Sequence, residues 1–224
     1  MEVIRTEKLE KVYQDNSVPV HAVNGVDLEI QKGEFVVIAG PSGSGKTTLL
    51  NLIGALDTPT RGKVFLEGED ISTKSRGQLS ELRLKKIGFV FQAYNLIPVL
   101  SALENIEFTM MLRGIPEKER ETRAIKVMEE LGIAELAHKR PNEMSGGQQQ
   151  RVAVARAIVN NPSIVLADEP TANLDSKTGS SLMALMERMN REKDITFVFS
   201  SHDPQVIESA KRLIILKDGR IRED

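Results

Sequence analysis

The sequence contains no cysteine and no tryptophan, and only 4% of its 224 residues are aromatic. Without cysteine there can be no disulfide framework, thiolate nucleophile or cysteine-ligated metal, so we expect a reduced, intracellular setting. The longest apolar runs have four or five residues, far fewer than the ~20 needed to span a bilayer. The first residues alternate charged and apolar side chains, unlike a secretory signal. We therefore expect neither export nor a membrane span.

Neither positive nor negative charge is in large excess. Lysine and arginine total 30 against 32 aspartates and glutamates, which leaves a formal charge of −2. Nucleic-acid binding usually requires a strongly basic face, so no nucleic-acid partner is expected. A chain of this length can bury on the order of 70% of its unfolded surface in one domain, or in one domain with an added lobe.

Several short apolar runs are continuous rather than alternating: FVVIA, IVLA, FVF and LIIL. Continuous runs are typical of strands covered on both faces of a parallel sheet. Between them, helical spacing of apolar residues predicts helices over 47–56, 177–193 and 204–211. The alternation of strands and helices predicts an α/β core with a mostly parallel sheet.

Two further segments, 3–30 and 63–71, are predicted to be short strands interrupted by glycine and aspartate. We interpret them as an antiparallel side sheet near the N-terminus. The interruptions are Gly25, Asp27, Gly68 and Asp70.

The stretch from about 92 to 160 contains no convincing strand pattern. Ser101 and Ser145 each open a predicted helix with a capping box, and Pro116 begins another that stops at Gly132. We therefore expect residues 92–160 to form an inserted α-helical subdomain, and residues 1–91 with 161–224 to form the α/β core and its side sheet.

The strongest motif is GPSGSGKT, which begins at Gly40, directly after the FVVIA strand and directly before a helix. This context matches a P-loop, in which glycines let successive backbone N–H groups face a phosphate at a helix N-terminus. Lys46 would reach the outer phosphates, and Thr47 can hold Mg²⁺. A chance glycine-rich turn is the competing interpretation, which the strand and helix context disfavours. The predicted phosphate-binding residues here are Gly40, Pro41, Ser42, Gly43, Ser44, Gly45, Lys46, Thr47 and Thr48.

Two adjacent carboxylates, Asp168 and Glu169, follow the IVLA strand. Side chains alternate along a strand, so the two acids should have different roles. We expect Asp168 to hold Mg²⁺ and Glu169 to accept a proton from an attacking water. Alone, such a pair would more often be a solvated turn, but strand ends are where open α/β sheets bind ligands.

Ser145, Gly146, Gly147 and Gln148 fit a capping box with two glycines in the first helical turn. Each glycine costs roughly 0.5 to 1 kcal/mol relative to alanine in a helix, and a plain cap needs neither. We therefore expect the helix start to expose N–H groups to a second phosphate.

With these pieces in order, the sequence resembles the ATP-binding cassette ATPases over nearly its whole length. The resemblance rests on GPSGSGKT, Gln92, SGGQ from Ser145, IVLADEP and His202. The stretches FQAYNLIPVLSALENIE and DEPTANLDSKTG are most similar to ATPase subunits of lipoprotein-release, macrolide-export and cell-division complexes.

The resemblance implies further roles. Tyr13 is similar to the aromatic residue that stacks on adenine, and Gln92 to the glutamine that touches Mg²⁺ or the lytic water. His202 is similar to the γ-phosphate contact, and Asp175 to the acid that links the two sites of a dimer. Taken alone, Tyr13 could simply pack in a strand, and His202 could be an ordinary surface histidine.

The family further implies that the SGGQ helix of one subunit caps the ATP on the P-loop of a second copy, in a head-to-tail homodimer. The expected function is ATP hydrolysis that drives a separate transmembrane permease, with the chain held on the inner face of the cell membrane. A division-type complex that transmits force without transport is the alternative, and metabolite kinases and chromosome-maintenance ATPases fit the motifs less well. The permease is expected to dock near Gln92 to Leu103, where Leu96, Ile97, Val99 and Leu100 either meet it or fill the lobe's own core.

Overall fold

A computed structural model describes residues 1–15 and 18–222 of the chain. Ten strands and seven α-helices are found in these residues, with two short 3-10 helices at Ala134–Leu136 and Pro141–Glu143. The strands are β1 Glu2–Asp15, β2 Val18–Gln31, β3 Phe35–Ala39, β4 Arg61–Leu66, β5 Glu69–Asp70, β6 Ile87–Phe91, β7 Ile164–Asp168, β8 Thr196–Ser201, β9 Arg212–Lys217 and β10 Arg220–Arg222. The helices are α1 Lys46–Ile53, α2 Arg76–Lys86, α3 Ala102–Leu112, α4 Glu117–Glu130, α5 Gly146–Ile158, α6 Ser176–Lys193 and α7 Pro204–Glu208.

The central sheet has the strand order β10-β9-β3-β8-β7-β6. Its strands run parallel except for β10, which pairs antiparallel with β9. A second, fully antiparallel sheet has the order β2-β1-β4-β5. The α/β fold with a mostly parallel sheet and an antiparallel side sheet is therefore confirmed.

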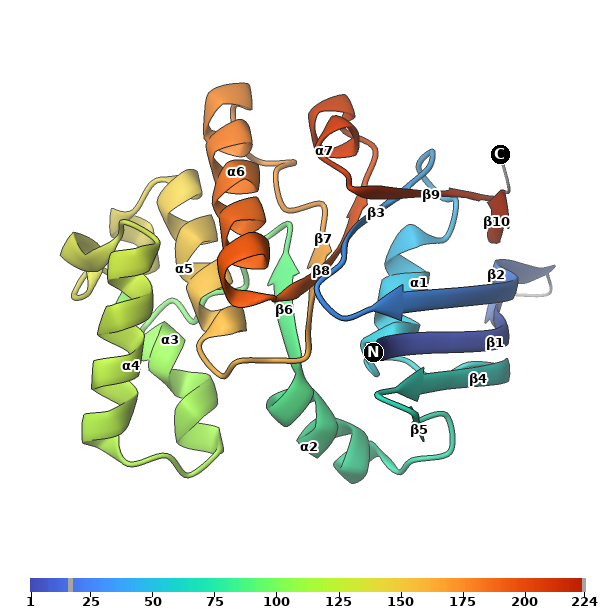
Figure 1. The fold of residues 1–224 in the computed structure, drawn as a ribbon, viewed down its shortest axis with the longest axis horizontal. Helices are drawn as coiled ribbons and strands as arrows, with labels where there is room; N and C mark the ends of the chain where they lie inside the picture. Colours follow the sequence, from blue (N-terminus) through green and yellow to red (C-terminus); the bar gives the residue numbers. More distant parts are fainter. Residues whose placement is uncertain (16–17, 223–224) are drawn as a thin grey trace.

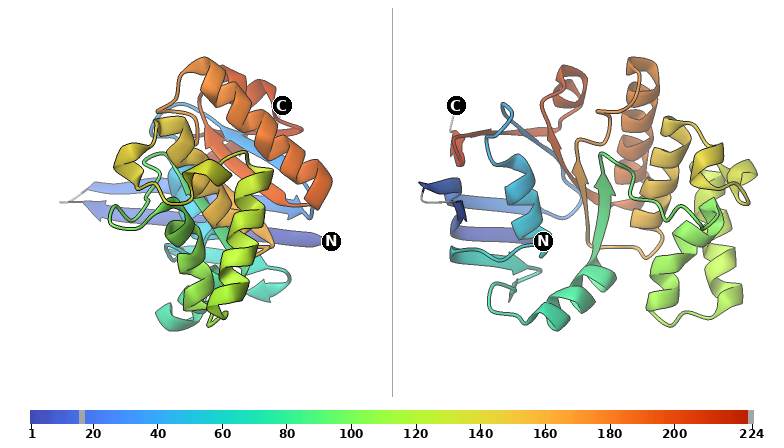
Figure 2. Two further views of the ribbon diagram at one scale, coloured as in Figure 1. Left: turned by 90° about the vertical axis from the view of Figure 1, so that its left-hand side faces the viewer. Right: turned by 180° about the vertical axis from the view of Figure 1, so that it is seen from behind.

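The core is divided by the central sheet into two parts. All five residues of β3 are buried, and they alternate between the two sides. Val36 and Ile38 join the cluster that contains the apolar residues of α1 and the side sheet. Phe35 and Val37 join the cluster that contains those of α3 to α6. In Figures 1 and 2, α1 accordingly lies between the two sheets, and helices α3 to α6 cover the opposite face.

The side-sheet strands are longer than the sequence predicted. Strands β1 and β2 have 14 residues each, because register shifts accommodate the residues expected to break them. Asp27 lies within β2, and its Oδ1 accepts a hydrogen bond from the backbone N–H of Lys8, which has a φ of 44°. Such bulges bend a strand without ending it.

Two helix boundaries also differ from the sequence prediction, and one helix was not predicted. Helix α1 ends at Ile53, with Gly54 as its C-cap, rather than at residue 56. Helix α7 ends at Glu208 rather than at residue 211, because Lys211 donates its N–H to the carbonyl oxygen of Phe35. Helix α2 was not predicted, although Ser75 and Gln78 form a capping box at its start.

Candidate functional site

Four of the predicted site segments follow neighbouring strands at one edge of the central sheet. The parallel register pairs Phe91 with Asp168, Asp168 with Ser200 and Ala39 with Ser201. Each strand end is followed directly by one site segment: the P-loop, Gln92, Glu169 or His202. These segments therefore lie at the carboxyl ends of adjacent strands, where open α/β sheets bind ligands.

The P-loop backbone is fixed by two carbonyl oxygens from neighbouring strands. A Cβ on Gly45 would collide with the carbonyl oxygen of Ala22 on β2, and one on Gly40 would collide with that of Leu216 on β9. Gly45 also has a φ of 101°, in the left-handed region that favours glycine. These positions therefore require glycine so that the loop can pass between the two strands.

The start of helix α1 has the features of an anion site. Its N-cap, Gly45, provides no side-chain hydrogen bond, whereas Ser75, Ser101 and Ser145 cap their own helices. The Oγ atom of Ser44 is buried and, among the described residues, has no hydrogen-bond partner. The uncapped helix start and this orphaned hydroxyl fit a phosphate-bearing ligand.

The ammonium group of Lys46 lies over this loop. Its Nζ atom donates to the carbonyl oxygens of Gly40 at 2.8 Å and of Pro41 at 3.1 Å, and Lys46 is only 7% exposed. No carboxylate among the described residues pairs with this buried cation. A buried charge without a counterion favours an anionic ligand.

The two adjacent carboxylates have different neighbours, as predicted, although Glu169 lies just beyond the end of β7 rather than on the strand. Asp168 Oδ1 accepts hydrogen bonds from Thr47 Oγ1 at 3.1 Å and from Ser200 Oγ. Thr47 and Asp168 together provide hard oxygen ligands, which suit Mg²⁺ when phosphate oxygens and water complete its shell. The structure, over its described residues, has no cluster of three or more histidine, aspartate and glutamate side chains for a metal. Thr47 and Asp168 would leave the rest of the coordination shell of such a cation to a phosphate-bearing ligand and water.

Glu169 is directed toward the end of β8. Its Oε2 accepts a hydrogen bond from Ser201 Oγ at 3.2 Å, and its Oε1 lies 2.7 Å from His202 Nδ1. The residue has a φ of 46°, a left-handed conformation that is uncommon outside glycine. A held carboxylate beside a histidine at a ligand-binding edge has the geometry of a general base.

Gln92 is exposed at the end of β6, beside the strand that carries Asp168. Its carbonyl oxygen accepts a hydrogen bond from Asn173 Nδ2 at 2.9 Å, which joins it to the segment after Glu169. Tyr94 and Asn95, two and three residues further on, have positive φ values of 60° and 49°. Gln92 is therefore followed by an unusually constrained turn.

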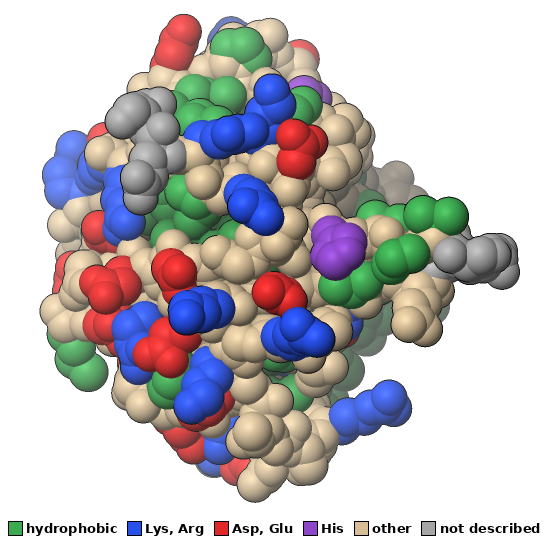
Figure 3. Space-filling view, turned by 90° about the vertical axis from the view of Figure 1, so that its right-hand side faces the viewer, with side chains coloured by type: hydrophobic (Ala, Val, Ile, Leu, Met, Phe, Trp, Pro, Cys, Tyr) green, Lys and Arg blue, Asp and Glu red, His purple; other side chains and the backbone are tan. Residues whose placement is uncertain are grey.

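Tyr13 lies on β1, near the N-terminus of α1. Its hydroxyl donates to Asp57 Oδ2 at 2.8 Å, and the side chain of Thr48 lies beside the same hydroxyl. Burial, together with the hydrogen bond to the Asp57 carboxylate, raises the pKa of the Tyr13 phenol. The side chain remains 39% exposed. Apolar side chains gather on the projecting hairpin of β1 and β2 (Figure 3), where Val18 and Val20 are largely exposed.

The helix that begins after Ser145 has both halves of the predicted capping box. Ser145 Oγ accepts from the Gln148 N–H at 3.3 Å, and Gln148 Oε1 accepts from the Ser145 N–H at 2.9 Å. The two glycines also have packing roles that the sequence did not reveal. A Cβ on Gly146 would lie 2.6 Å from the Tyr94 hydroxyl oxygen, and one on Gly147 would overlap the methyl group of Thr178.

Asp175 is the N-cap of helix α6. Its carboxylate accepts from the Thr178 N–H at 3.0 Å and from Thr178 Oγ1 at 2.6 Å, and these hydrogen bonds lower its pKa. Because Thr178 also contacts Gly147, Asp175 and the SGGQ segment are neighbours within one chain.

The chain thus brings most predicted site residues to one sheet edge, whereas Ser145 to Gln148 begin a helix on the far face. Helix α1 packs in the cluster of Val36 and Ile38, and helix α5 packs in that of Phe35 and Val37. Four residues that orient site residues or the turn after Gln92 were not predicted from the sequence: Asp57, Ser200, Ser201 and Arg156. Only the two serines could have been found from the sequence, because they directly precede His202 in the predicted strand.

The predicted docking segment has a mixed environment. Leu96 packs against the core cluster of the helical region, whereas Val99 is 73% exposed. Asn105 is buried and forms four hydrogen bonds with the backbone of residues 97, 100 and 101, so the segment has a fixed shape. Leu96 therefore fills the core, as one of the two interpretations predicted, whereas docking of a permease on this segment stays a prediction.

The parallel sheet, the uncapped P-loop helix and the strand-end carboxylates define a P-loop nucleotide-binding protein. Residues 23–172 match the profile of the ABC transporter family. The chain belongs to the ABC transporter family and is an ATPase of that family.

Individual relatives agree with this assignment. The chain is 48% identical over 211 residues to an uncharacterized ABC transporter ATP-binding protein of Thermotoga maritima, covering 94% of this chain and 90% of that protein. It is 45% identical to the macrolide export ATP-binding/permease protein MacB of Brucella melitensis, covering 99% of this chain but 34% of MacB.

Solved structures are similar over nearly the whole chain. The dimeric structure of the ABC transporter cassette MJ0796, a Methanocaldococcus jannaschii protein, aligns with a TM-score of 0.91 and 44% identity, over 98% of this chain and 97% of that one. A dimeric post-hydrolysis state of MJ0796 bound to ADP and Pi has a TM-score of 0.91 and 43% identity, with the same coverage. In residues 1–15 and 18–222, no helix is long and apolar enough to cross a membrane.

Proposed function

We propose that two copies of this chain enclose two Mg·ATP molecules head to tail, hydrolyse them, and drive a transmembrane permease of the efflux or lipoprotein-release type. The observation that carries the proposal is the separation of the P-loop helix α1 and the SGGQ helix α5 on opposite faces of the central sheet. A helix start on the far face is free to meet the nucleotide of a second subunit. The dimeric state of MJ0796 supports this arrangement.

In this proposal the P-loop from Gly40 to Thr48 binds the triphosphate through its backbone N–H groups and Lys46. Tyr13 stacks on the adenine, and Ser145 to Gln148 of the second copy face the γ-phosphate. Thr47 and Asp168 hold Mg²⁺, with Gln92 as a further ligand. The bound cation supplies charge neutralisation of the phosphate oxygens. Asp175 links the two sites across the dimer.

Glu169 is proposed to orient the attacking water and accept its proton, since its carboxylate is held between Ser201 and His202. The water oxygen forms a bond to the γ-phosphorus, and the bond from that phosphorus to the ADP oxygen breaks in line. His202 would contact a γ-phosphate oxygen and Lys46 would stabilise the charge that spreads over the transferred group.

Because the γ-phosphate is contacted from both subunits, ATP binding closes the dimer and hydrolysis weakens it. We further propose that residues 92–160 act as a helical subdomain that transmits this change, with the permease docked near Gln92 to Leu103. The chain would then lie at the inner face of the cell membrane. MacB of Brucella melitensis, a macrolide export ATP-binding/permease protein, supports this pairing.

The proposal is tested by replacing the base and following assembly. Purified Glu169→Gln protein, mixed with Mg·ATP, should elute from size-exclusion chromatography as a dimer and return to a monomer when ADP replaces ATP. Co-purification from detergent extracts of the native cell should recover an integral membrane protein with the wild-type chain. A Glu169→Gln protein that stays monomeric at saturating ATP would refute the dimeric mechanism.

A further inference from the structure

Gln150 lies on helix α5, two residues after the SGGQ segment, and its side chain is completely buried. Its Nε2 atom donates to the carbonyl oxygen of Pro170 at 2.7 Å and to that of Phe91 at 3.3 Å. Phe91 directly precedes Gln92, and Pro170 directly follows Glu169. One buried amide therefore bonds the backbone next to two site residues, although its partners lie 59 and 20 positions away in the sequence.

The other end of this amide has no partner. Gln150 Oε1 is buried and, among the described residues, accepts no hydrogen bond. An unpartnered buried acceptor destabilises a fold. Methionine, which has nearly the same length and volume, would fill the same space without that acceptor. The benefit of a glutamine at this position therefore lies in the two bonds that Nε2 makes.

The backbone around Glu169 requires such support. Glu169 has a φ of 46°, and a residue other than glycine keeps this left-handed conformation only where its surroundings fix it. Its own N–H donates to the carbonyl oxygen of Ser200 at 3.0 Å, which holds the peptide before it. The carbonyl oxygen of Pro170 accepts, among the described residues, only from Gln150. Gln150 is therefore the anchor on the other side of this strained residue.

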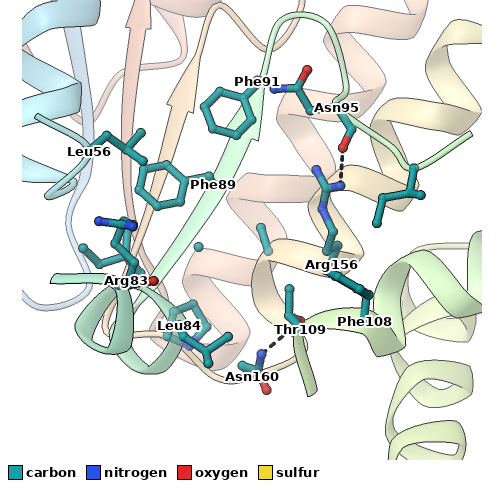
Figure 4. A pocket seen from close by; sticks show the side chains of 16 residues that line it. Leu56, Arg83, Leu84, Phe89, Phe91, Asn95, Phe108, Thr109, Arg156 and Asn160 are labelled. Atoms are coloured by element: carbon teal, nitrogen blue, oxygen red, sulfur yellow. Dashed lines mark hydrogen bonds between the residues drawn. The ribbon is translucent and has the colours of Figure 1, made fainter. Parts of the chain in front are cut away.

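The turn that contains Gln92, by contrast, has a second support on the same helix. Arg156 donates to the carbonyl oxygens of Tyr94 at 2.9 Å and Asn95 at 2.5 Å, and Figure 4 shows the bond to Asn95. Gln92 lies between this support and the bond that Gln150 makes at the end of β6. Loss of the Gln150 amide should therefore disturb the backbone at the base more than the turn after β6.

We propose that Gln150 is a positioning residue for hydrolysis: its amide holds the backbone that aims the Glu169 carboxylate. The inference rests on the proposed function, because it takes Glu169 to be the base. Gln150 is completely buried, so it acts through the backbone rather than by touching the nucleotide. A displacement of about 1 Å in a catalytic group can lower a rate roughly 100-fold. ATP binding, which the P-loop carries, should be unaffected.

The first test compares ATP hydrolysis by Gln150→Met and by the wild-type chain. Methionine keeps the size of the side chain but donates no hydrogen bond. We expect kcat to fall about 10-fold or more, while KM for Mg·ATP stays within about threefold, because only the base is misplaced. Phosphate release over a series of ATP concentrations gives both constants. If Gln150→Met does not fold, Gln150→Asn, whose amide is one carbon too short to reach both carbonyls, replaces it with the same expected result.

A double-mutant cycle assigns the effect to Glu169. In the Glu169→Gln background the base is already lost, so adding Gln150→Met should change the residual turnover by less than about twofold. A merely structural role would lower turnover in both backgrounds. ATP-driven dimerisation of the double variant should equal that of Glu169→Gln, because the capping box at Ser145 keeps both of its bonds.

Asn190→Leu is the matched control for the loss of a buried amide. Asn190 is 4% exposed, and its Nδ2 atom donates to the carbonyl oxygens of Gly33 at 2.7 Å and Ile195 at 2.8 Å. These partners precede β3 and β8, so they lie at the end of the central sheet opposite to Glu169. Asn190→Leu should lower the unfolding temperature as Gln150→Met does, but should leave kcat within about twofold of wild type.

A wild-type kcat in Gln150→Met, a further loss of more than about twofold in the Glu169→Gln background, loss of ATP-driven dimerisation in the double variant, or an equal loss of kcat in Asn190→Leu would each overturn the inference. The proposed function fails on different results: unchanged turnover in Glu169→Gln alone, or a Glu169→Gln protein that stays monomeric with ATP. Neither of these measurements involves Gln150, so the two failures are distinguishable.

Discussion

The Nδ1 atom of His202 lies 2.7 Å from Oε1 of Glu169, although the two residues are 33 positions apart in the sequence. They meet because β7 and β8 are adjacent parallel strands that end at the same level. Ser201 Oγ donates to the other carboxylate oxygen at 3.2 Å. Glu169 is therefore held from two sides at the edge where the P-loop begins.

Replacing Glu169 with glutamine should slow ATP hydrolysis by roughly 100-fold or more, because the amide cannot accept the water proton. ATP binding should be retained. Phosphate release under saturating ATP measures the first effect, and titration with a fluorescent ATP analogue measures the second. Glu135→Gln, at an exposed glutamate of the helical region, is the matched control. Unchanged turnover in Glu169→Gln would show that another group is the base.

Lys46→Ala should weaken nucleotide binding itself. The ammonium is buried at the P-loop and contacts only carbonyl oxygens among the described residues, so its removal deletes the local positive charge. Calorimetric titration with Mg·ATP should give at least a tenfold higher Kd, equivalent to about 1.4 kcal/mol. An affinity equal to that of wild type would exclude the lysine from phosphate binding.

Gly147→Ala should impair ATP-dependent dimerisation, because the new Cβ would overlap the Thr178 methyl group and displace the start of α5. The double variant Gly147→Ala/Thr178→Ser should recover much of the lost assembly. Serine lacks the methyl group but keeps the hydroxyl that bonds Asp175. Both proteins are made in the Glu169→Gln background and compared by size-exclusion chromatography with ATP. A double variant no better than Gly147→Ala would contradict the steric explanation.

Leu96→Asp and Val99→Asp should separate folding from docking. Leu96 packs against the core, so the aspartate should destabilise the chain by about 2 to 4 kcal/mol. Val99 is 73% exposed, and its substitution should leave the unfolding temperature within a few degrees of wild type. Thermal unfolding followed by circular dichroism measures both. If Val99→Asp also fails to bind the permease in co-purification, the segment is part of the docking surface.

Tyr13→Phe should keep ATP affinity close to that of wild type, whereas Tyr13→Ala should lower it by about 5- to 10-fold, since stacking on a base contributes roughly 1 to 3 kcal/mol. The phenylalanine variant loses only the hydroxyl bond to Asp57. Competition by inorganic tripolyphosphate, which carries no base, separates base stacking from phosphate contacts. Equal affinities of all three proteins would place the adenine elsewhere.

Much of the fold was predictable because its strongest signals are local. Continuous apolar runs predicted β3, β7 and β9, and glycine-rich or capping patterns predicted the starts of α1, α3 and α5. The length of β1 and β2 was not predictable from residue type, because the register shifts near Lys8 and Asp27 depend on pairing with distant residues. The boundaries of the helical subdomain remain a prediction.

The candidate site also contains features that the sequence predicts and features that it does not. P-loop and strand-end residues are contiguous in sequence, so their spacing predicted them. Glycines 146 and 147 were interpreted as exposing N–H groups, whereas the structure adds contacts with Tyr94 and Thr178 that only the three-dimensional arrangement reveals. Arg156 was missed for the same reason, because its partners lie 61 and 62 positions away.

The close approach of the Ala22 carbonyl oxygen to Gly45 has a mechanical consequence. Ala22 belongs to β2, which pairs with β1 along its length and so with the strand that carries Tyr13. A shift of either strand would push the phosphate-binding loop, because no space separates them. The paired strands β1 and β2 therefore fix the distance between the base end and the phosphate end of the proposed nucleotide site. Substitutions in these strands, even far from any phosphate, should alter the affinity for the triphosphate.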